Sequence, residues 1–398
     1  MSELSYLEKL MDGVEVEWKT LEDITLRTSN IKWREAIRSY RYIDLTSVDI
    51  ATKKIIETTE ITKNNAPSRA QKLVDENDVI FATTRPTQQR FCLIDSEYAG
   101  AVASTGYCIL RAKKDQVLPK WILHWISTSD FKKHVEENQS GSAYPAISDS
   151  KVKECLIPIP CPDNPEKSLA IQSEIVRILD KFTALTAELT AELNMRKKQY
   201  NYYRDQLLSF EEGSVEWKSL GEVAIITIGA FVRKDKQNPD ADYPVYNGGR
   251  TPTGYYEDFN NDGDKIIVSA RGANAGFVNK SSTPYWAGNS CYSISVRSTE
   301  QLHWMYVYYY LKQSETKLTG IQQKGGIPAV SKKQMEDLLL PIPSKSEQVR
   351  IVTILDKFDT LTNSITEGLP REIELRQKQY EYYRDLLFSF PKHETTSN

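Results

Sequence analysis

The strongest constraint on the fold of this chain is that long parts of its sequence occur twice. VEWK at residues 16–19 returns at 215–218. QYNYYRD at 199–205 returns as QYEYYRD at 379–385. Words of this length in the same order are not chance products of composition, so the chain is a tandem duplication. Further repeated words are ILDKF at 178–182 and 354–358, YPAIS at 144–148 with IPAVS at 327–331, and IPIP at 157–160 with LPIP at 340–343.

Each repeat combines a globular part with a long helix. Short β-rich runs, such as DVIFA at 78–82 and KIIVS at 265–269, alternate with turn-forming residues in the globular parts. The sequence therefore predicts an α+β fold, in which a mixed α/β globular domain followed by a long helix occurs in tandem. The predicted segments are an N-terminal segment (1–13), a first globular domain (14–160), a first helix (161–211), a second globular domain (212–343), a second helix (344–391) and a flexible C-terminal tail (392–398).

The apolar residues of the helical parts follow a coiled-coil pattern. Between Ile171 and Leu189 they recur at steps that alternate between four and three residues, as the a and d positions of a seam do. Because the two helices share one chain, each is at high effective concentration for the other, and we expect them to pack as an antiparallel coiled coil. A coiled coil between two chains is the alternative. GLP at 368–370 predicts a kink in the second helix.

One stretch of the first helix, TAELTAEL at 186–193, repeats a four-residue word. Each copy lengthens an α-helix by about 6 Å and turns the rest of the helix by about 40° beyond one full turn. Such a repeat is typical of an adjustable spacer. The predicted spacer residues are Thr186, Leu189, Thr190 and Leu193.

The repeated helix ends are rich in tyrosine. Three tyrosines within four residues cannot all face one seam, so some should point outward, where amphipathic aromatic side chains suit a protein interface. The alternative is that they belong to a core. The candidates for contacting a partner protein are Tyr200, Tyr202, Tyr203, Tyr380, Tyr382 and Tyr383.

Composition limits the remaining possibilities. The net charge of −3 argues against binding nucleic acid through bulk charge, although it leaves room for local basic clefts. The five cysteines form no C-x-x-C word, which favours buried, reduced thiols over disulfides or a zinc site. The chain has no apolar run long enough to cross a bilayer, and its start lacks the features of a secretory signal. We therefore expect a cytoplasmic protein without a membrane partner.

The residues needed for common enzymatic chemistry are not found in this sequence. It has no P-loop word and no G-x-G-x-x-G cofactor loop, and its four histidines are scattered. No acidic–lysine arrangement typical of a nuclease follows its Pro-Asp words. These observations predict a non-catalytic protein.

The duplication of a variable globular part and a conserved helix, together with TAELTAEL and the paired ILDKF and YYRD words, resembles the specificity subunit of type I restriction–modification enzymes, most closely the type IC branch. The resemblance covers the whole chain. It implies that each globular part is a target recognition domain reading one half of a bipartite site in double-stranded DNA. It also implies that the helices dock two methyltransferase subunits, that restriction subunits join them, and that the number of TAEL copies sets the gap between the half-sites.

The same resemblance implies where the chemistry lies. S-adenosylmethionine, ATP and Mg²⁺ are expected on the partner subunits, and neither a cofactor nor a metal is expected in this chain. The alternative functions are a coiled-coil scaffold with two protein-binding domains and a lone nuclease.

Polar loops that follow predicted strands are the best candidates for contacting DNA, because reading bases requires Arg, Lys, Asn or Gln. Arg85 and Arg271 each follow the equivalent strand of their domain, and we expect them to occupy matching positions. For any single residue the alternative is a solvated loop side chain. The segments 140–148 and 324–331 are expected to be structural junctions, with phosphate binding by nearby lysines as the alternative. The full set of candidates is Lys63, Arg69, Arg85, Gln88, Gln89 and Arg90 in the first domain, and Arg250, Arg271, Asn274 and Lys324 in the second.

Overall fold

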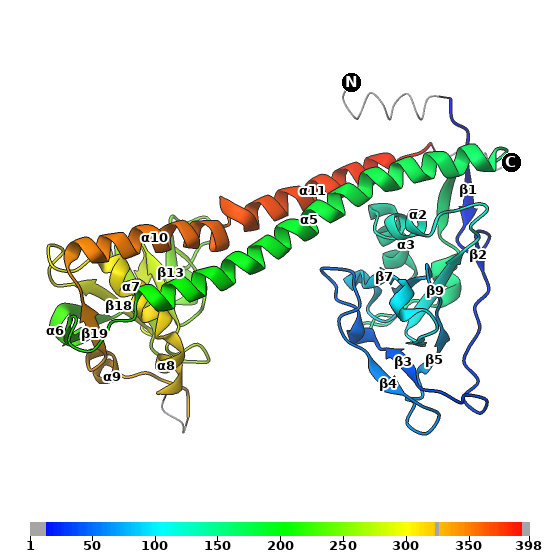
Figure 1. Ribbon diagram of the computed structural model, residues 1–398. Coiled ribbons are helices and arrows are strands. Elements are labelled where there is room, and N and C mark those ends of the chain that lie inside the picture. Colours follow the sequence, from blue (N-terminus) through cyan, green and yellow to red (C-terminus); the bar gives the residue numbers. More distant parts are fainter. Residues whose placement is uncertain (1–12, 323–325, 392–398) are drawn as a thin grey trace. The chain divides into compact units, whose positions relative to one another are not determined.

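The computed structural model describes residues 13–322 and 326–391 (Figure 1). The described residues form two compact units. Unit 1 combines residues up to 190 with residues from 372 onward, and unit 2 consists of residues 191–371. Residues 372–391, which belong to the second repeat, therefore lie in the unit of the first globular domain. The predicted N-terminal segment and C-terminal tail lie, except for Gly13, outside the described residues.

Unit 1 is built on two four-stranded sheets and a two-stranded clasp. In the first sheet the order is β2-β9-β6-β7, and all its neighbours are antiparallel. In the second the order is β4-β3-β8-β5, and β3 and β8 are parallel. The strands are β1 (Val16–Thr20), β2 (Thr25–Leu26), β3 (Tyr40–Ile43), β4 (Thr59–Ile61), β5 (Ala70–Leu73), β6 (Val79–Ala82), β7 (Phe91–Leu93), β8 (Val102–Ser104), β9 (Tyr107–Ala112) and β10 (Leu156–Pro160).

The run VIFA of β6 is apolar throughout because both faces of its sheet are covered. Val79 and Phe81 lie in a core shared with the helices of unit 1, where Trp121 is fully buried. Ile80 and Ala82, on the opposite face, lie in a second core. The helices of unit 1 outside the long helical segments are α2 (Pro119–Trp125), α3 (Ser129–Asn138) and α4 (Asp149–Lys153), with 3-10 turns η1 (Leu45–Ser47), η2 (Pro86–Gln88) and η3 (Ser96–Tyr98).

Unit 2 repeats this plan with different sequence. Its main sheet has the order β12-β18-β15-β16, beside a three-stranded sheet β14-β13-β17 and a clasp β11-β19. The strands are β11 (Glu216–Ser219), β12 (Ala224–Ile228), β13 (Tyr243–Tyr246), β14 (Gly254–Tyr256), β15 (Lys265–Ser269), β16 (Val278–Ser281), β17 (Trp286–Ala287), β18 (Cys291–Val296) and β19 (Leu339–Ile342). The short helices are α6 (Leu220–Val223), α7 (Trp304–Gln313), α8 (Glu315–Gly320), α9 (Lys332–Glu336) and the 3-10 turn η4 (Lys234–Lys236).

The repeated words at the domain ends form the clasps. In unit 1, β1 carries VEWK and pairs antiparallel with the IPIP strand β10, with Trp18 opposite Pro158. In unit 2, Trp217 lies opposite Pro341 in the corresponding pair. These words recur because they join the two ends of each globular domain, whatever sequence lies between them.

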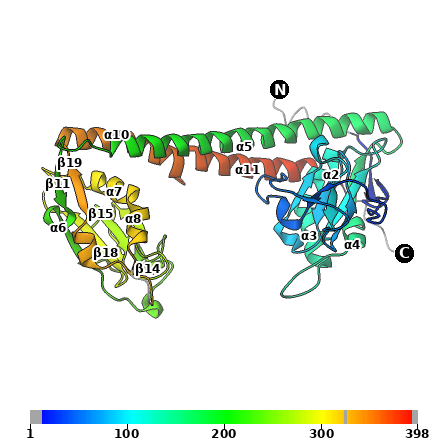
Figure 2. The same cartoon turned by 60° about the horizontal axis from the view of Figure 1, so that its bottom comes forward.

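In each unit two helical segments from different repeats pack against each other. In unit 1 the first part of α5 (Pro165–Leu207) lies beside α11 (Gly368–Leu387) in both views (Figures 1 and 2), and Phe182 stacks on Tyr383 with ring centroids 5.4 Å apart. In unit 2 the last part of α5 lies beside α10 (Lys345–Asn363), where Tyr203 stacks on Phe358 at 5.7 Å. An ILDKF word thus meets the YYRD word of the other repeat, which is the antiparallel arrangement expected from the seam.

The second helix differs from the prediction. It was expected to run through residues 344–391 with a kink, but it is interrupted: α10 ends at Asn363 and α11 begins at Gly368. Gly368 has φ 78°, and a Cβ there would lie 2.4 Å from the carbonyl oxygen of Thr360. The first turn of α11 then accommodates Pro370, since the missing N–H has no helical partner at that position.

Membrane-spanning helices and metal-binding clusters are both missing from the described residues. None of their helices combines the length and the apolar character that crossing a membrane requires. None of their histidine, cysteine, aspartate and glutamate side chains gather in a group of three that could hold a metal ion.

Candidate functional site

In unit 1 the two candidate loops of the first domain flank one turn, which joins β8 to β9. The backbone N–H of Thr105 donates to the carbonyl of Arg69 at 2.8 Å, and the N–H of Thr83 donates to the carbonyl of Gly106 at 2.8 Å. The β4–β5 loop (62–69) and the β6–β7 loop (83–90) are therefore neighbours. Arg69 and Arg85 are exposed, so the structure brings together cations that are separated in sequence. Lys63, at the other end of its loop, is also exposed.

Arg85 lies where the β6–β7 loop turns sharply. Its φ of 50° is in the left-handed region, and Pro86 behind it is buried and fixes the 3-10 turn η2. The Arg85 guanidinium lies 5.2 Å from the centroid of the exposed Tyr144 ring. Gln88, in the same turn, is exposed. A short polar turn on a buried strand is a rigid place from which to present hydrogen-bonding groups.

Two candidates of this loop point inward, and their prediction as DNA contacts is corrected. Arg90 donates through Nη1 to the carbonyl of Val48 at 2.9 Å and also to that of Leu45. Its guanidinium therefore fixes the segment around η1. The Gln89 side-chain nitrogen is buried and has no hydrogen-bond partner among the described residues. The sequence carried one signal of this: Arg90 directly precedes a buried strand.

A lysine that the sequence did not point out lies beside Arg90. Lys53 donates to the carbonyl of Gln89, and its ammonium lies 4.4 Å from the centroid of the Phe91 ring. Burial lowers the pKa of Lys53 to about 8; Asp49 opposes this shift and Arg90 adds to it. Lys53 and Arg90 thus place their cations inside the loop rather than toward a ligand.

In unit 2 the candidates come together more closely. The Arg250 Nε donates to the Asn274 side-chain oxygen at 3.3 Å, and the Asn274 amide donates to the carbonyl of Gly248 at 3.3 Å. Gly248 has φ 79°, and a Cβ there would lie 3.0 Å from the carbonyl oxygen of Arg271. The β13–β14 loop and the β15–β16 loop therefore form one surface with Arg250 and Arg271 exposed on it.

Lys324 lies outside the described residues. The chain that leads to it does neighbour this surface, because the Gln322 side-chain amide donates to the carbonyl of Ala275 at 2.5 Å.

The expectation that Arg85 and Arg271 occupy matching positions is wrong by one residue. The N–H of Arg85 donates to the carbonyl of Pro145 at 2.7 Å, while in unit 2 the N–H of Gly272 donates to the carbonyl of Pro328 at 2.9 Å. Arg85 therefore matches Gly272, and Arg271 matches Thr84. Backbone shape explains the match: this position has a positive φ, 50° at Arg85 and 93° at Gly272, which glycine adopts at no steric cost.

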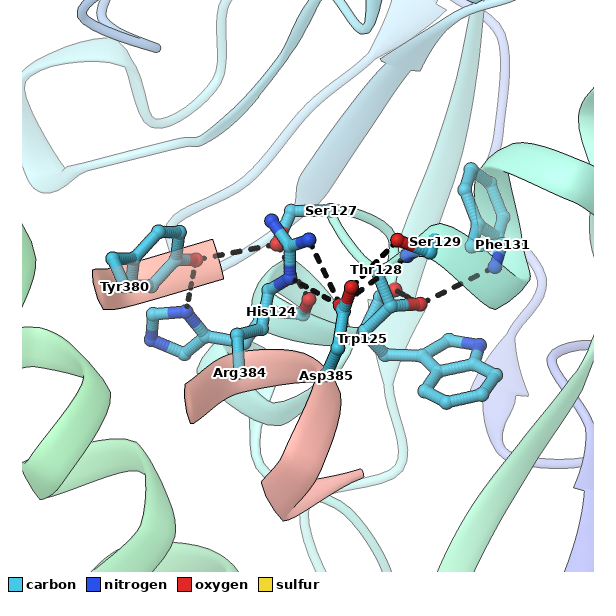
Figure 3. Close-up of polar contacts among 9 residues, drawn as sticks. All are labelled: His124, Trp125, Ser127, Thr128, Ser129, Phe131, Tyr380, Arg384 and Asp385. Carbon is cyan, nitrogen blue, oxygen red and sulfur yellow. Dashed lines mark hydrogen bonds and ion pairs between the residues drawn. The ribbon is translucent and has the colours of Figure 1, made fainter. Parts of the chain in front are cut away.

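The first tyrosine of each repeated triplet is internal, which corrects its prediction as a surface contact. The Tyr380 hydroxyl hydrogen-bonds His124 Nδ1 at 2.9 Å and Ser127 Oγ at 3.2 Å within unit 1 (Figure 3). Tyr200 is 9% exposed and lies in the core of unit 2. The third tyrosines, Tyr203 and Tyr383, stack on the phenylalanines of the ILDKF words.

The middle tyrosines point outward, with exposed fractions of 62% for Tyr202 and 64% for Tyr382. Each forms an edge-to-face pair with the next tyrosine, at 5.4 Å and 75° in unit 2 and at 5.3 Å and 74° in unit 1. These two pairs were predicted as contacts with a partner protein, and they lie on the surface.

The same side-chain network surrounds both exposed pairs. Arg376 donates to Glu372 at 2.7 Å and to the Gln379 side-chain oxygen at 2.9 Å. In unit 2, the corresponding Arg196 donates to Glu192 at 2.6 Å and to Gln199 at 2.8 Å. A surface hollow of about 360 Å³ adjoins the unit 1 copy. Sequence reasoning missed these polar residues, although their E-x3-R-x2-Q spacing is the same in both repeats. We call these two networks, with their tyrosine pairs, the repeated helix surfaces.

The predicted spacer residues lie within the unbroken helix α5. Thr186 and Thr190 donate their hydroxyls to the carbonyls four residues earlier, of Phe182 at 2.9 Å and of Thr186 at 2.7 Å. The boundary between the two units falls between Thr190 and Ala191, inside TAELTAEL. Leu189 and Leu193 are partly buried on the same helix.

Comparisons with known proteins agree with this architecture. The family model for the type I restriction modification DNA specificity domain matches residues 14–196 and again 213–375. The specificity subunit of the Escherichia coli type I restriction enzyme EcoR124I/EcoR124II is 43% identical, and the match covers 100% of both chains. That of the E. coli enzyme EcoprrI is 36% identical over 92% of this chain and 93% of its own length.

Solved structures show the same fold. The S subunit of a type I restriction–modification system from M. genitalium covers 96% of this chain and 98% of its own, with a TM-score of 0.63 and 16% identity. A second chain comes from a study of complex assembly and conformational transition in a type I restriction–modification system. It covers 94% of this chain and 97% of its own, with a TM-score of 0.61 and 24% identity. The matched family is described as a DNA specificity domain, and both named relatives are specificity subunits. Because the family model matches twice and the relatives match over nearly their full length, the chain belongs to the family of type I restriction–modification specificity subunits.

Proposed function

We propose that this chain directs a type I restriction–modification complex to a bipartite site in double-stranded DNA, with one half-site read by each unit. The observation that carries the proposal is that each unit gathers exposed cations, with an exposed or partly exposed amide, on neighbouring loops at the end of a buried sheet. In unit 1 these are Arg69, Arg85 and Gln88, and in unit 2 they are Arg250, Arg271 and Asn274. Such groups form paired hydrogen bonds with base edges and contact phosphates.

The partners are inferred from the repeated helix surfaces. Two copies of one side-chain network suit two copies of one partner, and we assign them to two methyltransferase subunits, with restriction subunits joining the assembly. S-adenosylmethionine, ATP and Mg²⁺ belong to those partners in this proposal. A complex that acts on cellular DNA also places the chain in the cytoplasm.

TAELTAEL supports assignment to the type IC branch and a role in setting the gap between half-sites. One further copy would rotate the remainder of α5 by about 40°, close to the roughly 35° per base pair that results from 10–10.5 base pairs per turn. Its rise of about 6 Å exceeds the roughly 3.4 Å of one base step, so helix inclination or supercoiling has to absorb the difference.

Insertion of a third TAEL after Leu193 tests this role. In a host that also expresses the methyltransferase partner, sequencing of methylated adenines should show both half-sites unchanged and a longer gap between them. A four-alanine insertion at the same place is the matched control, since it adds the same helical length without the TAEL side chains. An unchanged gap with full methylation would refute the spacer role.

A coiled-coil scaffold with two protein-binding domains is the alternative function. Mobility-shift measurements with the reconstituted methyltransferase complex distinguish the two, because a scaffold would show no preference among DNA sequences.

A further inference from the structure

Each unit exposes one large apolar side chain at the same point of its fold. Tyr144 has an exposed fraction of 71% and Ile327 one of 76%. Each directly precedes the Pro-Ala of the segment that leads from the globular domain toward its clasp. These segments were expected to be structural junctions, with phosphate binding by nearby lysines as the alternative.

Backbone hydrogen bonds show that the two positions correspond. In unit 1 the N–H of Ile147 donates to the carbonyl of Thr83 at 2.9 Å, and in unit 2 the N–H of Val330 donates to that of Ala270 at 2.9 Å. Arg85 and Gly272 also donate their N–H groups to the carbonyls of Pro145 and Pro328. In each unit, the segment after the exposed residue is therefore paired with the loop that carries the DNA-contact candidates. Tyr144 and Ile327 are therefore attached to those loops, not to a distant part of the domain.

The junctions are held firmly enough to present a side chain in one place. Ala146 forms bridges with both Thr84 and Ser140, and Ala329 forms a bridge with Arg271. The proline that comes after each exposed residue also restricts its backbone. A backbone fixed in this way needs little further ordering when the side chain that it carries binds a ligand.

Single exposed apolar residues are common on proteins and need no explanation by themselves. Here the exposure recurs at one position of two domains whose loop sequences differ, and the side chain changes from tyrosine to isoleucine while remaining apolar. Its neighbours are the groups proposed to contact DNA: the Arg85 guanidinium lies 5.2 Å from the Tyr144 ring, and Arg271 pairs with the residue two positions after Ile327.

We propose that Tyr144 and Ile327 each contact the bases of one half-site through their apolar surface, at a thymine methyl group or a partly opened base step. Apolar side chains are used in both ways by DNA-binding proteins. The change from a flat aromatic ring to a branched aliphatic chain gives the two units different base preferences at this position. This inference rests on the proposed function, since it adds a contact to the same surface.

The test uses the full chain in complex with its methyltransferase partner and a DNA duplex carrying the methylated site. Tyr144→Ala and Ile327→Ala should each weaken binding about tenfold, while Tyr144→Phe should bind within about twofold of the unchanged protein. Because these contacts release no counterions, the slope of log affinity against log salt should stay the same for both alanine variants. Arg85→Ala should instead reduce that slope by about one.

The matched controls are Leu156→Ala and Leu339→Ala. These leucines are also exposed and also correspond between the units, but they lie on the clasps, opposite Thr20 and Ser219. They should leave binding unchanged. Circular dichroism of each variant establishes that it is folded. When one half-site is scrambled, only the alanine variant of the unit that reads the intact half-site should still lose affinity. Scrambling the other half-site should instead leave only the second alanine variant sensitive.

The outcomes are distinguishable. If Tyr144→Ala and Ile327→Ala bind like the unchanged protein while Arg85→Ala and Arg271→Ala bind more weakly, the inference is wrong and the proposed function stands. A reduced salt slope for Tyr144→Ala would also overturn it, since the residue would then be acting on phosphate contacts. If none of the four variants weakens binding, the proposed function fails as well.

Discussion

The two units hold the same repeated helix end in different ways. In unit 1, the Tyr380 hydroxyl shares hydrogen bonds with His124 and Ser127 (Figure 3). His124 also contacts Asp180 at 3.0 Å through Nε2. In unit 2, the residue that corresponds to His124 is Tyr309, whose hydroxyl donates directly to Asp356 at 2.5 Å. None of the described residues hydrogen-bonds the hydroxyl of Tyr200.

Two further bonds establish this correspondence. The N–H of Leu118 donates to the Gln172 side-chain oxygen at 2.9 Å, and the N–H of His303 donates to that of Gln348 at 2.8 Å. The helix side of the contact is therefore constant, with a glutamine and an aspartate in both repeats. The globular side varies. The comparison teaches that the duplication preserved the helices, while each domain evolved its own way of binding them.

The largest expected effect is loss of the internal tyrosines. Tyr380→Ala should lower the free energy of unfolding of unit 1 by about 3–4 kcal/mol, and Tyr200→Ala should do so for unit 2, because each removes a large ring from a packed core. Hydrogen exchange, followed separately for residues of each unit, measures this. The exposed Tyr382→Ala and Tyr202→Ala are the controls and should change stability by less than about 0.5 kcal/mol. Equal losses from exposed and internal tyrosines would contradict the assignment.

Removing only the hydroxyl of the internal tyrosine should affect the stability of the two units differently. Tyr380→Phe should lower the free energy of unfolding by about 1–2 kcal/mol, since it removes one hydrogen-bond partner that His124 and Ser127 share in the folded state. Tyr200→Phe should change the free energy of unfolding by less than about 0.5 kcal/mol. Urea titration of both variants gives the two values. A larger loss for Tyr200→Phe would reverse the comparison.

The smallest effect concerns pH. Burial pushes the pKa of Asp180 upward, but the hydrogen bonds from His124 and Lys120 outweigh it, so the pKa lies below its ordinary value. A carboxylate with a lowered pKa stabilises the folded state above the pKa it has when unfolded, near 4, and loses that contribution as the pH falls further.

The stability difference between the unchanged protein and Asp180→Asn should therefore shrink between about pH 5 and pH 2. Thermal unfolding across this range measures it, with Asp356→Asn as the matched variant of unit 2. A difference that stays constant with pH would show that the Asp180 carboxylate is not stabilised in its charged form.

Several features could be predicted from the sequence because they depend on local pattern or on repetition. The duplication, the α+β character of each half and the antiparallel packing of seam-bearing helices follow from repeated words and apolar spacing. The candidate loops were found because polar residues come directly after apolar strands. The orientation of individual side chains in those loops could not be found this way, since it depends on which distant backbone groups each side chain reaches, as the Arg90 bonds to Leu45 and Val48 show.

The sequence by itself determined the plan: two related halves, each a globular domain followed by a helix with an apolar seam. Tertiary structure alone decided that Arg90 faces inward, that Arg85 matches Gly272, and that Tyr380 and Tyr200 pack inside the units. The physical reason is that each of these depends on contacts between residues far apart in the chain. Buried backbone carbonyls, a positive φ and a partner ring in the other repeat leave no periodic trace in the sequence.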